Sequence, residues 1–278
     1  MIEYVQILIS GAKIGYMTLF FKKHLSSALL FIFLSSSSSL YAKDLIFILA
    51  GQSNMVGQGK SYELPTKYRN APKNVEFFYN GYKAPINRFR HFGPEIGFAH
   101  EISRYFPHDN IKLIKFAVGG TSLFAWDPYW NVNKAHLTHN ASAGPLFKKL
   151  IQTVNIQFNH NDNKLAGILW MQGETDAQYS VAAKQYAGNL NQFISSLRSK
   201  LHSPNTLFIM GSVNPPLKLF PSAPLVQHAQ RLSASRIRSV RLVKTDDLSK
   251  RNDDLHYNTE GQLELGKRFA RTYLKYSR

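Results

Sequence analysis

Continuous apolar runs alternate with amphipathic stretches along this chain, and that alternation restricts the fold more than any other feature of the sequence. Apolar runs of about four to eight residues are typical of strands buried on both faces. We predict strands over Leu45–Ala50, Ile111–Val118, Leu165–Met171, Leu207–Met210 and Val240–Val243. The shorter run Val75–Tyr79 fits an edge strand or one arm of a hairpin.

The stretches between these runs have the spacing of amphipathic helices. We predict helices over Pro94–Tyr105, Leu146–Phe158, Ala182–Leu201 and Thr259–Tyr276. Strands that alternate with helices fold into a parallel sheet covered on both faces. No Gly/Ser-rich linker divides residues 43–278, so we expect a single α/β domain there.

The first 42 residues differ in character from the rest. Two lysines, Lys22 and Lys23, precede the short apolar run Leu25–Leu34, and Ala42 offers a small residue for cleavage. The run is well short of the ~20 residues that a membrane-spanning helix needs. We therefore predict a signal peptide that starts at Met17, rather than an anchor, and a periplasmic or secreted protein.

Residues 43–278 carry most of the positive charge. The chain has a net charge of +17, and residues 1–42 contain three lysines and one glutamate, so removing them leaves +15. Such a domain attracts polyanions, which suggests an acidic glycan as substrate or loose association with an anionic envelope surface. We expect no nucleic-acid partner, because the sequence has no motif that reads DNA or RNA. The absence of cysteine excludes disulfides, thiolate metal sites and cysteine nucleophiles.

Polar motifs follow the predicted strands, and the carboxyl ends of parallel strands are where active sites form. The segment GQSNM (51–55) follows the first strand, so Ser53 can present its hydroxyl at the sheet edge. A helix-capping turn is the alternative role for Ser53 or Asn54. The next strand is followed by Gly119 and Gly120, which expose backbone N–H groups to an oxyanion or a phosphate, or simply form a turn.

Two further motifs carry acids and a base. The segment QGETD (172–176) offers the Gln172 amide to an oxyanion, while Glu174 is an acid, an orienting group or part of a structural network. Asp253 and His256 lie three residues apart, before the last predicted helix. In a turn, that spacing brings the carboxylate to the imidazole, whose other nitrogen can then take a serine proton.

Together these motifs supply a nucleophile, a base, an orienting carboxylate and oxyanion donors, which predicts an acyl-transfer hydrolase. A Gly-x-Ser-x-Gly elbow is absent, which argues against the α/β-hydrolase class. The sequence has no His-Glu-x-x-His segment and no ligand cluster for zinc, so we predict neither metal nor cofactor.

The same motifs, in the same order, resemble those of the SGNH hydrolase superfamily. The nearest branch is sialate O-acetylesterase-like and acetylxylan-esterase-like, in carbohydrate esterase family six. The resemblance rests on GQSNM (51–55), GGTS (119–122), WMQGETD (170–176), and Asp253 with His256. It implies a three-layer α/β/α sandwich, flavodoxin-like, with about five parallel strands. It also implies a serine esterase that removes O-acetyl groups from a sugar or polysaccharide through an acyl-serine.

The resemblance assigns the catalytic roles. It makes Ser53 the nucleophile, His256 the general base and Asp253 the group that orients the base. Glu174 is an alternative partner of the histidine. No cofactor is needed for this chemistry.

The oxyanion donors implied by the resemblance are the N–H groups of Ser53 and Gly120, the latter in preference to Gly119, and the side chain of Gln172. The chain departs from many relatives at Met171, where His or Tyr is common, and we expect this change to alter the acyl or sugar pocket.

We expect Gln52, Asn54 and Trp126 to contact the substrate. Trp126 belongs to a group of aromatic side chains that follows the paired glycines, and such side chains stack on sugar rings or pack their loop onto the domain. The other members of the group are Phe124, Tyr129 and Trp130.

Two alternatives stay open from sequence. A lipase or thioesterase of the same superfamily would act on longer acyl chains. A catalytically inactive glycan-binding module would have lost the serine, the histidine or a donor, and none of these is missing here.

Overall fold

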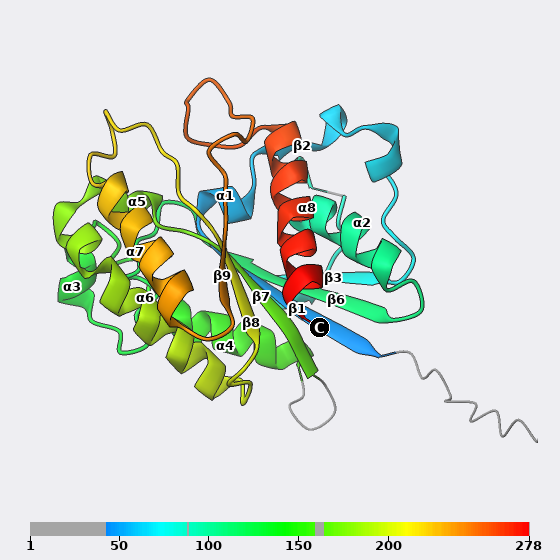
Figure 1. Cartoon of the computed structure of the whole chain (residues 1–278), viewed down its shortest axis with the longest axis horizontal. Coiled ribbons are helices and arrows are strands. Elements are labelled where there is room, and N and C mark those ends of the chain that lie inside the picture. Colours follow the sequence, from blue (N-terminus) through cyan, green and yellow to red (C-terminus); the bar gives the residue numbers. More distant parts are fainter. Residues whose placement is uncertain (1–42, 88, 159–163, 278) are drawn as a thin grey trace, which may run out of the picture. The chain divides into compact units, whose positions relative to one another are not determined.

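A seven-stranded sheet forms the centre of the structure (Figure 1), a computed structural model that describes residues 43–277 apart from residues 88 and 159–163. The strand order is β4-β3-β6-β1-β7-β8-β9. The strands are β1 (Asp44–Gly51), β3 (Val75–Tyr79), β4 (Tyr82–Lys83), β6 (Asn110–Ala117), β7 (Lys164–Met171), β8 (Leu207–Gly211) and β9 (Val240–Val243). All five strands predicted from the long apolar runs are present. The predicted signal peptide lies outside the described residues and stays a prediction.

The sheet is parallel except at one edge. Each strand from β3 to β9 in the sheet order pairs in parallel with its neighbours, and only β4 is antiparallel. Val75–Tyr79 is therefore both a parallel strand beside β6 and one arm of a hairpin with β4, so it extends the five predicted parallel strands by one. A separate antiparallel pair joins β2 (Gly59–Lys60) to β5 (His91–Phe92).

Helices cover both faces of the sheet, which confirms the three-layer α/β/α prediction. One face carries α2 (Glu95–Tyr105) and α8 (Thr259–Tyr276), which pack against each other. The other carries α4 (Leu146–Gln157), α6 (Ser180–Lys200) and α7 (Ala223–Arg236) (Figure 1). None of the described helices combines the length and the apolar character that a membrane span requires.

Side chains alternate along the strands and so pack against the helices on both faces of the sheet. Phe47 of β1 makes edge contacts with Phe98 of α2 and Tyr273 of α8, with ring centroids 4.9 and 4.8 Å apart. On the opposite face, Trp170 of β7 packs against Phe193 of α6 at 4.5 Å. Because both faces are apolar, the strands appear in the sequence as continuous apolar runs.

Helix α7 was not predicted from the sequence. Its buried side chains are small or polar, so the sequence of this helix shows little amphipathic pattern. These positions are Ala223, Val226, Ala229, Gln230 and Ser233.

Short elements occupy the carboxyl edge of the sheet, where the polar motifs lie. The single-turn helix α1 (Ser53–Val56) follows β1, and α5 (Glu174–Gln178) follows β7. A further short helix, α3 (Val132–His136), and two 3₁₀ turns, η1 (Ser61–Glu63) and η2 (Thr66–Tyr68), lie in the connecting loops.

Candidate active site

Ser53 is the first residue of α1, directly after the turn that ends β1. Gly51 makes that turn with φ 146°, and a Cβ there would lie 2.0 Å from the carbonyl oxygen of Met171 in β7. Only glycine fits this position without strain. Ser53 is partly exposed while its neighbours Gln52 and Asn54 are buried. Within the described residues the Ser53 hydroxyl has no hydrogen-bond partner, so its oxygen is available for reaction.

The glycine loop after β6 lies beside Ser53. A Cβ on Gly119 would be 3.7 Å from the Ser53 Cβ, and Gly120 has φ 67° with open space beside it. Asn140 holds this loop: its amide donates to the Gly120 carbonyl at 2.9 Å and accepts from the Ser122 N–H at 2.8 Å. Sequence reasoning missed Asn140, since no local motif marks it.

The backbone N–H groups of Ser53, Gly119 and Gly120 have no acceptor among the described residues. Two glycines and a helix N-terminus thus offer unpaired donors on one side of the serine. Such an arrangement can bind a negatively charged oxygen.

Asp253 and His256 are in direct contact, as their spacing predicts. The imidazole Nδ1 lies 2.8 Å from Asp253 Oδ2, and Asp253 Oδ1 accepts the N–H groups of Leu255 at 3.0 Å and His256 at 2.9 Å. Partial burial acts to raise the Asp253 pKa, but the hydrogen bonds from His256 and Leu255 outweigh it, and the pKa lies below the usual value. The carboxylate is therefore charged at neutral pH and places a proton on Nδ1, which leaves the Nε2 lone pair free.

Asn54 connects the turn that carries Ser53 (the serine turn, residues 51–53) to the loop that carries His256 (the histidine loop, residues 253–257). Its amide nitrogen donates to the Leu255 carbonyl at 3.2 Å, and its oxygen accepts the Tyr257 N–H at 3.0 Å. Both chain neighbours of His256 are thus bound to the residue that follows Ser53. Asn54 is only 1% exposed, which corrects the expectation that it contacts substrate.

Glu174 binds Asn54 rather than the imidazole. Its Oε1 accepts from the Asn54 amide at 2.8 Å, and its Oε2 has no partner among the described residues. Burial raises the Glu174 pKa, while the Asn54 hydrogen bond and the nearby His256 charge oppose the shift. Of the two carboxylates expected as partners of the histidine, Asp253 holds the ring nitrogen.

The Gln172 amide is fully engaged inside the protein. Its nitrogen lies 2.9 Å from the Thr121 carbonyl oxygen and 2.5 Å from Asp176 Oδ2, and its oxygen accepts from Tyr186 at 3.2 Å. The side chain is completely buried. Both amide hydrogens have internal acceptors, so the expected donation from Gln172 to an oxyanion is not met. Gln172 does lie at the end of a strand, as the sequence predicts, but the sequence does not show which way its side chain points.

Gln52 and Asp176 complete this buried network. Gln52 accepts the Gly173 N–H at 3.1 Å and is 2% exposed, so it joins two strand ends and does not reach substrate, contrary to expectation. Asp176 accepts the Leu123 N–H, 3.1 Å from each oxygen, and burial raises the Asp176 pKa to about 7. The network fixes the glycine loop relative to β7.

Burial corrects the expected substrate contact of Trp126 and favours, for Phe124, the alternative of packing the loop onto the domain. Trp126 is 0% exposed, donates to Thr121 Oγ1 at 3.0 Å and lies edge-on to Trp170 at 5.2 Å. It supports the loop from inside the core and cannot stack on a sugar. Phe124 is equally buried, whereas Tyr129 is 73% exposed and stays on the surface.

Met171 is also buried, and it packs against Gly211, where a Cβ would lie 2.4 Å from its sulfur. The side chain lies within the core between strands β7 and β8. The expectation that it alters the acyl or sugar pocket stays a prediction.

A hollow of about 550 Å³ lies beside Asp253. Three cationic side chains line it, Lys60, Lys250 and Arg251, against two anionic ones, Glu63 and Asp253. Lys250 donates to a backbone carbonyl at 2.6 Å, and Arg251 to Gln58 at 2.8 Å. The hollow has an excess of positive charge next to the histidine pair.

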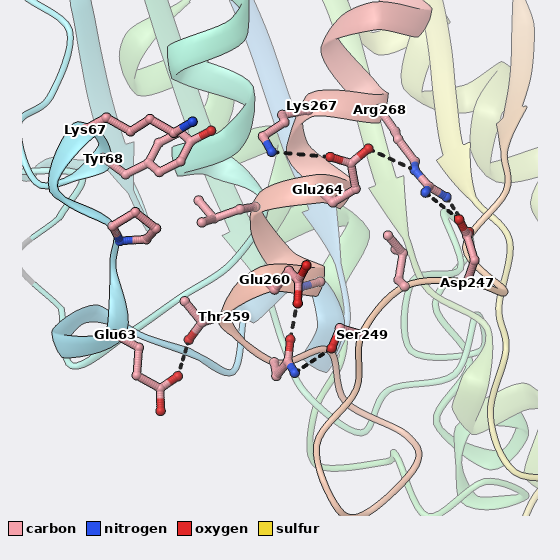
Figure 2. A pocket seen from close by; sticks show the side chains of 15 residues that line it. Glu63, Lys67, Tyr68, Asp247, Ser249, Thr259, Glu260, Glu264, Lys267 and Arg268 are labelled. Carbon is pink, nitrogen blue, oxygen red and sulfur yellow. Dashed lines mark hydrogen bonds and ion pairs between the residues drawn. The ribbon is translucent and has the colours of Figure 1, made fainter.

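A larger groove of about 730 Å³ lies between α8 and residues 63–68 (Figure 2). Neither Ser53 nor His256 lines it, and several of its charges are already paired. Lys267 lies 3.3 Å from Glu264, and Arg268 lies 2.6 Å from Asp247. In the described parts of the chain, no three His, Cys, Asp or Glu side chains are grouped to hold a metal ion.

The covered parallel sheet, with a serine after its first strand and an Asp-x-x-His segment before its last helix, defines an SGNH-like esterase. The family model described as "Carbohydrate esterase, sialic acid-specific acetylesterase" matches residues 43–275. The chain belongs to this family of carbohydrate acetylesterases, which confirms the resemblance seen in the sequence.

Individual relatives agree with this family. The "Probable carbohydrate esterase At4g34215" of Arabidopsis thaliana is 24% identical over 255 residues, 82% of this chain and 90% of that protein. The X-ray structure of the Arabidopsis thaliana protein AT4G34215 has a TM-score of 0.71 and 21% identity, and the match covers 86% of this chain and 100% of that one.

Two further solved structures share the fold as well. XAC1771, a carbohydrate acetylesterase from Xanthomonas citri, has a TM-score of 0.62 and 17% identity, over 81% of this chain and 54% of that one. NanS has a TM-score of 0.61 and 15% identity, over 84% and 97%. At these identities the likeness shows the fold alone.

Proposed function

We propose that this protein is a serine esterase that removes O-acetyl groups from a carbohydrate through an acyl-serine intermediate. One observation carries the proposal. The Asp253–His256 pair, 2.8 Å apart, belongs to a loop that is hydrogen-bonded to Asn54, the residue directly after Ser53. A base with a fixed tautomer and an unpaired serine hydroxyl thereby belong to one site.

The first half of the reaction forms the acyl-enzyme. His256 Nε2 takes the proton of Ser53 as Oγ attacks the acetyl carbonyl carbon, and the negative charge moves to the carbonyl oxygen. The imidazolium then gives its proton to the sugar oxygen as the ester C–O bond breaks. Asp253 stabilises the imidazolium throughout.

The second half releases acetate. Water gives a proton to His256 and attacks the acyl carbon, and the Ser53 oxygen leaves with that proton. The N–H groups of Ser53 and Gly120, or Gly119, hold the oxyanion in both halves. Loss of one such donor typically costs ~2.7–4 kcal/mol of transition-state stabilisation.

The substrate that we favour is an acetylated sugar with a negative charge. The excess of cationic side chains in the hollow beside Asp253 supports this choice, and so does the net charge of the chain, +17. The same charge favours loose association with an anionic envelope surface.

The test is hydrolysis of 4-nitrophenyl acetate, butyrate and octanoate by the full chain, beside Ser53→Ala. We expect acetate to be preferred, and Ser53→Ala to lower kcat on the order of 10⁴-fold or more. Ser195→Ala is the matched control, because Ser195 only donates to the Gln192 carbonyl on α6. Equal rates for the parent and Ser53→Ala contradict a serine mechanism, and a preference for octanoate moves the proposal to lipid substrates.

The same preparation tests the charge of the substrate. We expect kcat/KM for an O-acetylated sialic acid to exceed that for a neutral acetylated xylose, and to fall as salt is added. Equal values at all salt concentrations contradict the preference for an acidic sugar.

A further inference from the structure

We propose that Asn54 and Glu174 form a positioning pair that holds His256 in register with Ser53. This inference rests on the proposed function. Neither residue touches the reacting atoms in this proposal: Asn54 acts through the backbone on either side of the histidine, and Glu174 acts through Asn54.

The contacts of Asn54 are suited to this task. Asn54 is the second residue of α1, directly after Ser53, and it is 1% exposed. It donates to the carbonyl of Leu255 and accepts from the N–H of Tyr257, so one planar amide is hydrogen-bonded to the backbone on both sides of His256. A buried amide with three partners has one orientation, and the histidine backbone is therefore fixed relative to the serine turn.

Glu174 determines which way round the Asn54 amide lies. A carboxylate only accepts hydrogen bonds, and so does the Leu255 carbonyl, so both select the NH₂ side of the amide. The oxygen side is then left to face the Tyr257 N–H. Without Glu174, the Asn54 amide loses one of the two hydrogen bonds that its NH₂ group donates, and the orientation in which its oxygen accepts the Tyr257 N–H is less strongly favoured.

Position at a strand end gives Glu174 its fixed place. Glu174 is the first residue of α5, just after β7, and is 2% exposed. Ser53 follows β1, which pairs with β7. The Asn54–Glu174 pair is therefore a bridge between the histidine loop and the ends of two neighbouring strands, β1 and β7, which are rigid supports.

The experiment exchanges the amide and the carboxylate. Asn54→Asp places two carboxylates together and removes both donated hydrogen bonds, while Glu174→Gln keeps an acceptor for Asn54. The double variant restores a donor–acceptor pair in reverse, from Gln at 174 to Asp at 54. We measure kcat and KM for 4-nitrophenyl acetate, and the hydrogen-exchange rate of the Tyr257 amide, on the full chain.

Asn74→Asp is the matched control. Asn74 also donates to two carbonyls, those of Phe106 at 2.8 Å and Asp109 at 2.9 Å, and accepts from Ser103 at 2.6 Å. It precedes β3, at the amino end of the sheet and away from the site. The same chemical change there should alter stability without changing kcat beyond about twofold.

For Asn54→Asp we expect kcat to fall about tenfold to a hundredfold, with KM within about twofold, because a small displacement of the base slows proton transfer. The Tyr257 amide should exchange faster. The double variant should recover at least about fivefold in kcat over Asn54→Asp.

An unchanged kcat in folded Asn54→Asp overturns the proposal, and so does a double variant no better than the single one. If Asn54→Asp does not fold, the double variant decides: activity within about tenfold of Glu174→Gln supports the bridge, and lower activity overturns it. A parent without serine-dependent activity refutes the proposed function instead, and Tyr257 exchange then tests the bridge by itself.

Discussion

Two glycines at the site meet different surroundings, so their substitution should separate stability from activity. Gly51→Ala places a methyl group 2.0 Å from a carbonyl oxygen at φ 146°. We expect it to lower the free energy of unfolding by about 2 kcal/mol or more. Gly119→Ala meets only ordinary contact, 3.7 Å from the Ser53 Cβ, and should melt like the parent while lowering kcat/KM. Thermal unfolding and ester hydrolysis check both, and a Gly119→Ala variant with full activity would argue against an oxyanion site there.

Residue type and spacing were enough to predict part of the site. The Asp253–His256 contact is local, so a spacing of three residues predicts it, and Ser53 follows from its place after a buried strand. The directions of Gln172 and Trp126 depend on partners from distant segments, Thr121 for Gln172 and Phe193 for Trp126. Spacing along the chain carries no information on those contacts.

At the scale of elements, a buried ion pair supports the serine helix. Lys115 of β6 donates to the carbonyl of Val56, the last residue of α1, at 2.8 Å and to Glu95 at 2.7 Å. Both side chains of the pair are at most 3% exposed, and burial lowers the Lys115 pKa. The lysine thus neutralises Glu95 and caps the C-terminal end of α1.

Lys115→Met should leave Glu95 buried without a counter-charge. We expect a loss of about 3–5 kcal/mol in the free energy of unfolding, and recovery of much of it in Lys115→Met with Glu95→Gln. Urea unfolding of the parent and both variants measures this. A single variant as stable as the parent would show that the pair contributes nothing to the fold.

Ion pairs also explain why the apolar run of β6 is interrupted by charged residues in the sequence. Lys112 and Lys115 interrupt the apolar run of β6, yet Lys112 binds Asp44 at 2.6 Å and Lys115 lies within the core. Long runs with helices on both faces were predicted correctly, because burial alone determines their pattern. Helix α7 was missed because its buried face includes Gln230 and Ser233.

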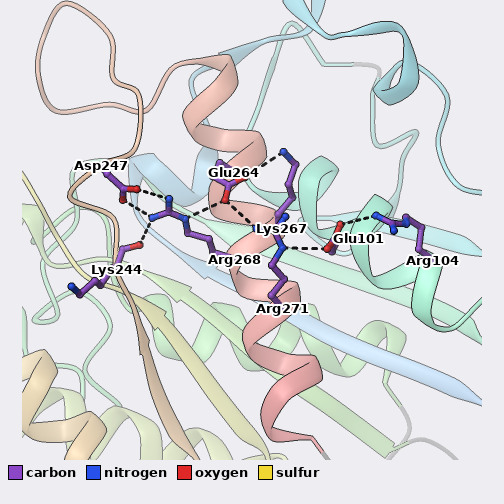
Figure 3. Close-up of polar contacts among 8 residues, drawn as sticks. All are labelled: Glu101, Arg104, Lys244, Asp247, Glu264, Lys267, Arg268 and Arg271. Atoms are coloured by element: carbon purple, nitrogen blue, oxygen red, sulfur yellow. Dashed lines mark hydrogen bonds and ion pairs between the residues drawn. The ribbon is translucent and has the colours of Figure 1, made fainter.

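At the scale of the whole molecule, a network of charged side chains joins α2, α8 and the segment after β9 (Figure 3). Arg268 makes two contacts to Asp247, at 2.6 and 2.7 Å, and one to Glu264 at 3.3 Å. Arg271 continues the network to Glu101 at 3.3 Å. Elements far apart in the sequence are thus linked at the surface as well as in the core.

The network makes stability depend on pH. The hydrogen bonds from Arg268 lower the pKa of Asp247 to about 2, below its usual 3.8. A lowered carboxyl pKa stabilises the fold above the usual value, and this contribution is lost as pH falls through about 2. Asp247→Asn should therefore melt below the parent at pH 7, and the difference should shrink from pH 4 to pH 2. If the difference in melting temperature between the parent and Asp247→Asn is the same at every pH, the ionised Asp247 carboxylate is not the source of the stabilisation.

The bond between Asn54 and Tyr257 spans 203 positions of the chain. The serine turn is synthesised roughly 200 residues before the loop that carries its proposed base, His256. A contact so distant in sequence closes a large loop, so we expect it to form after the intervening strands have paired. If Ser53 and His256 act together as proposed, catalytic activity requires completed folding. In the proposed mechanism, a chain that still lacks the segment with His256 carries Ser53 without its base, so we expect serine-dependent reactivity only once the whole domain is assembled.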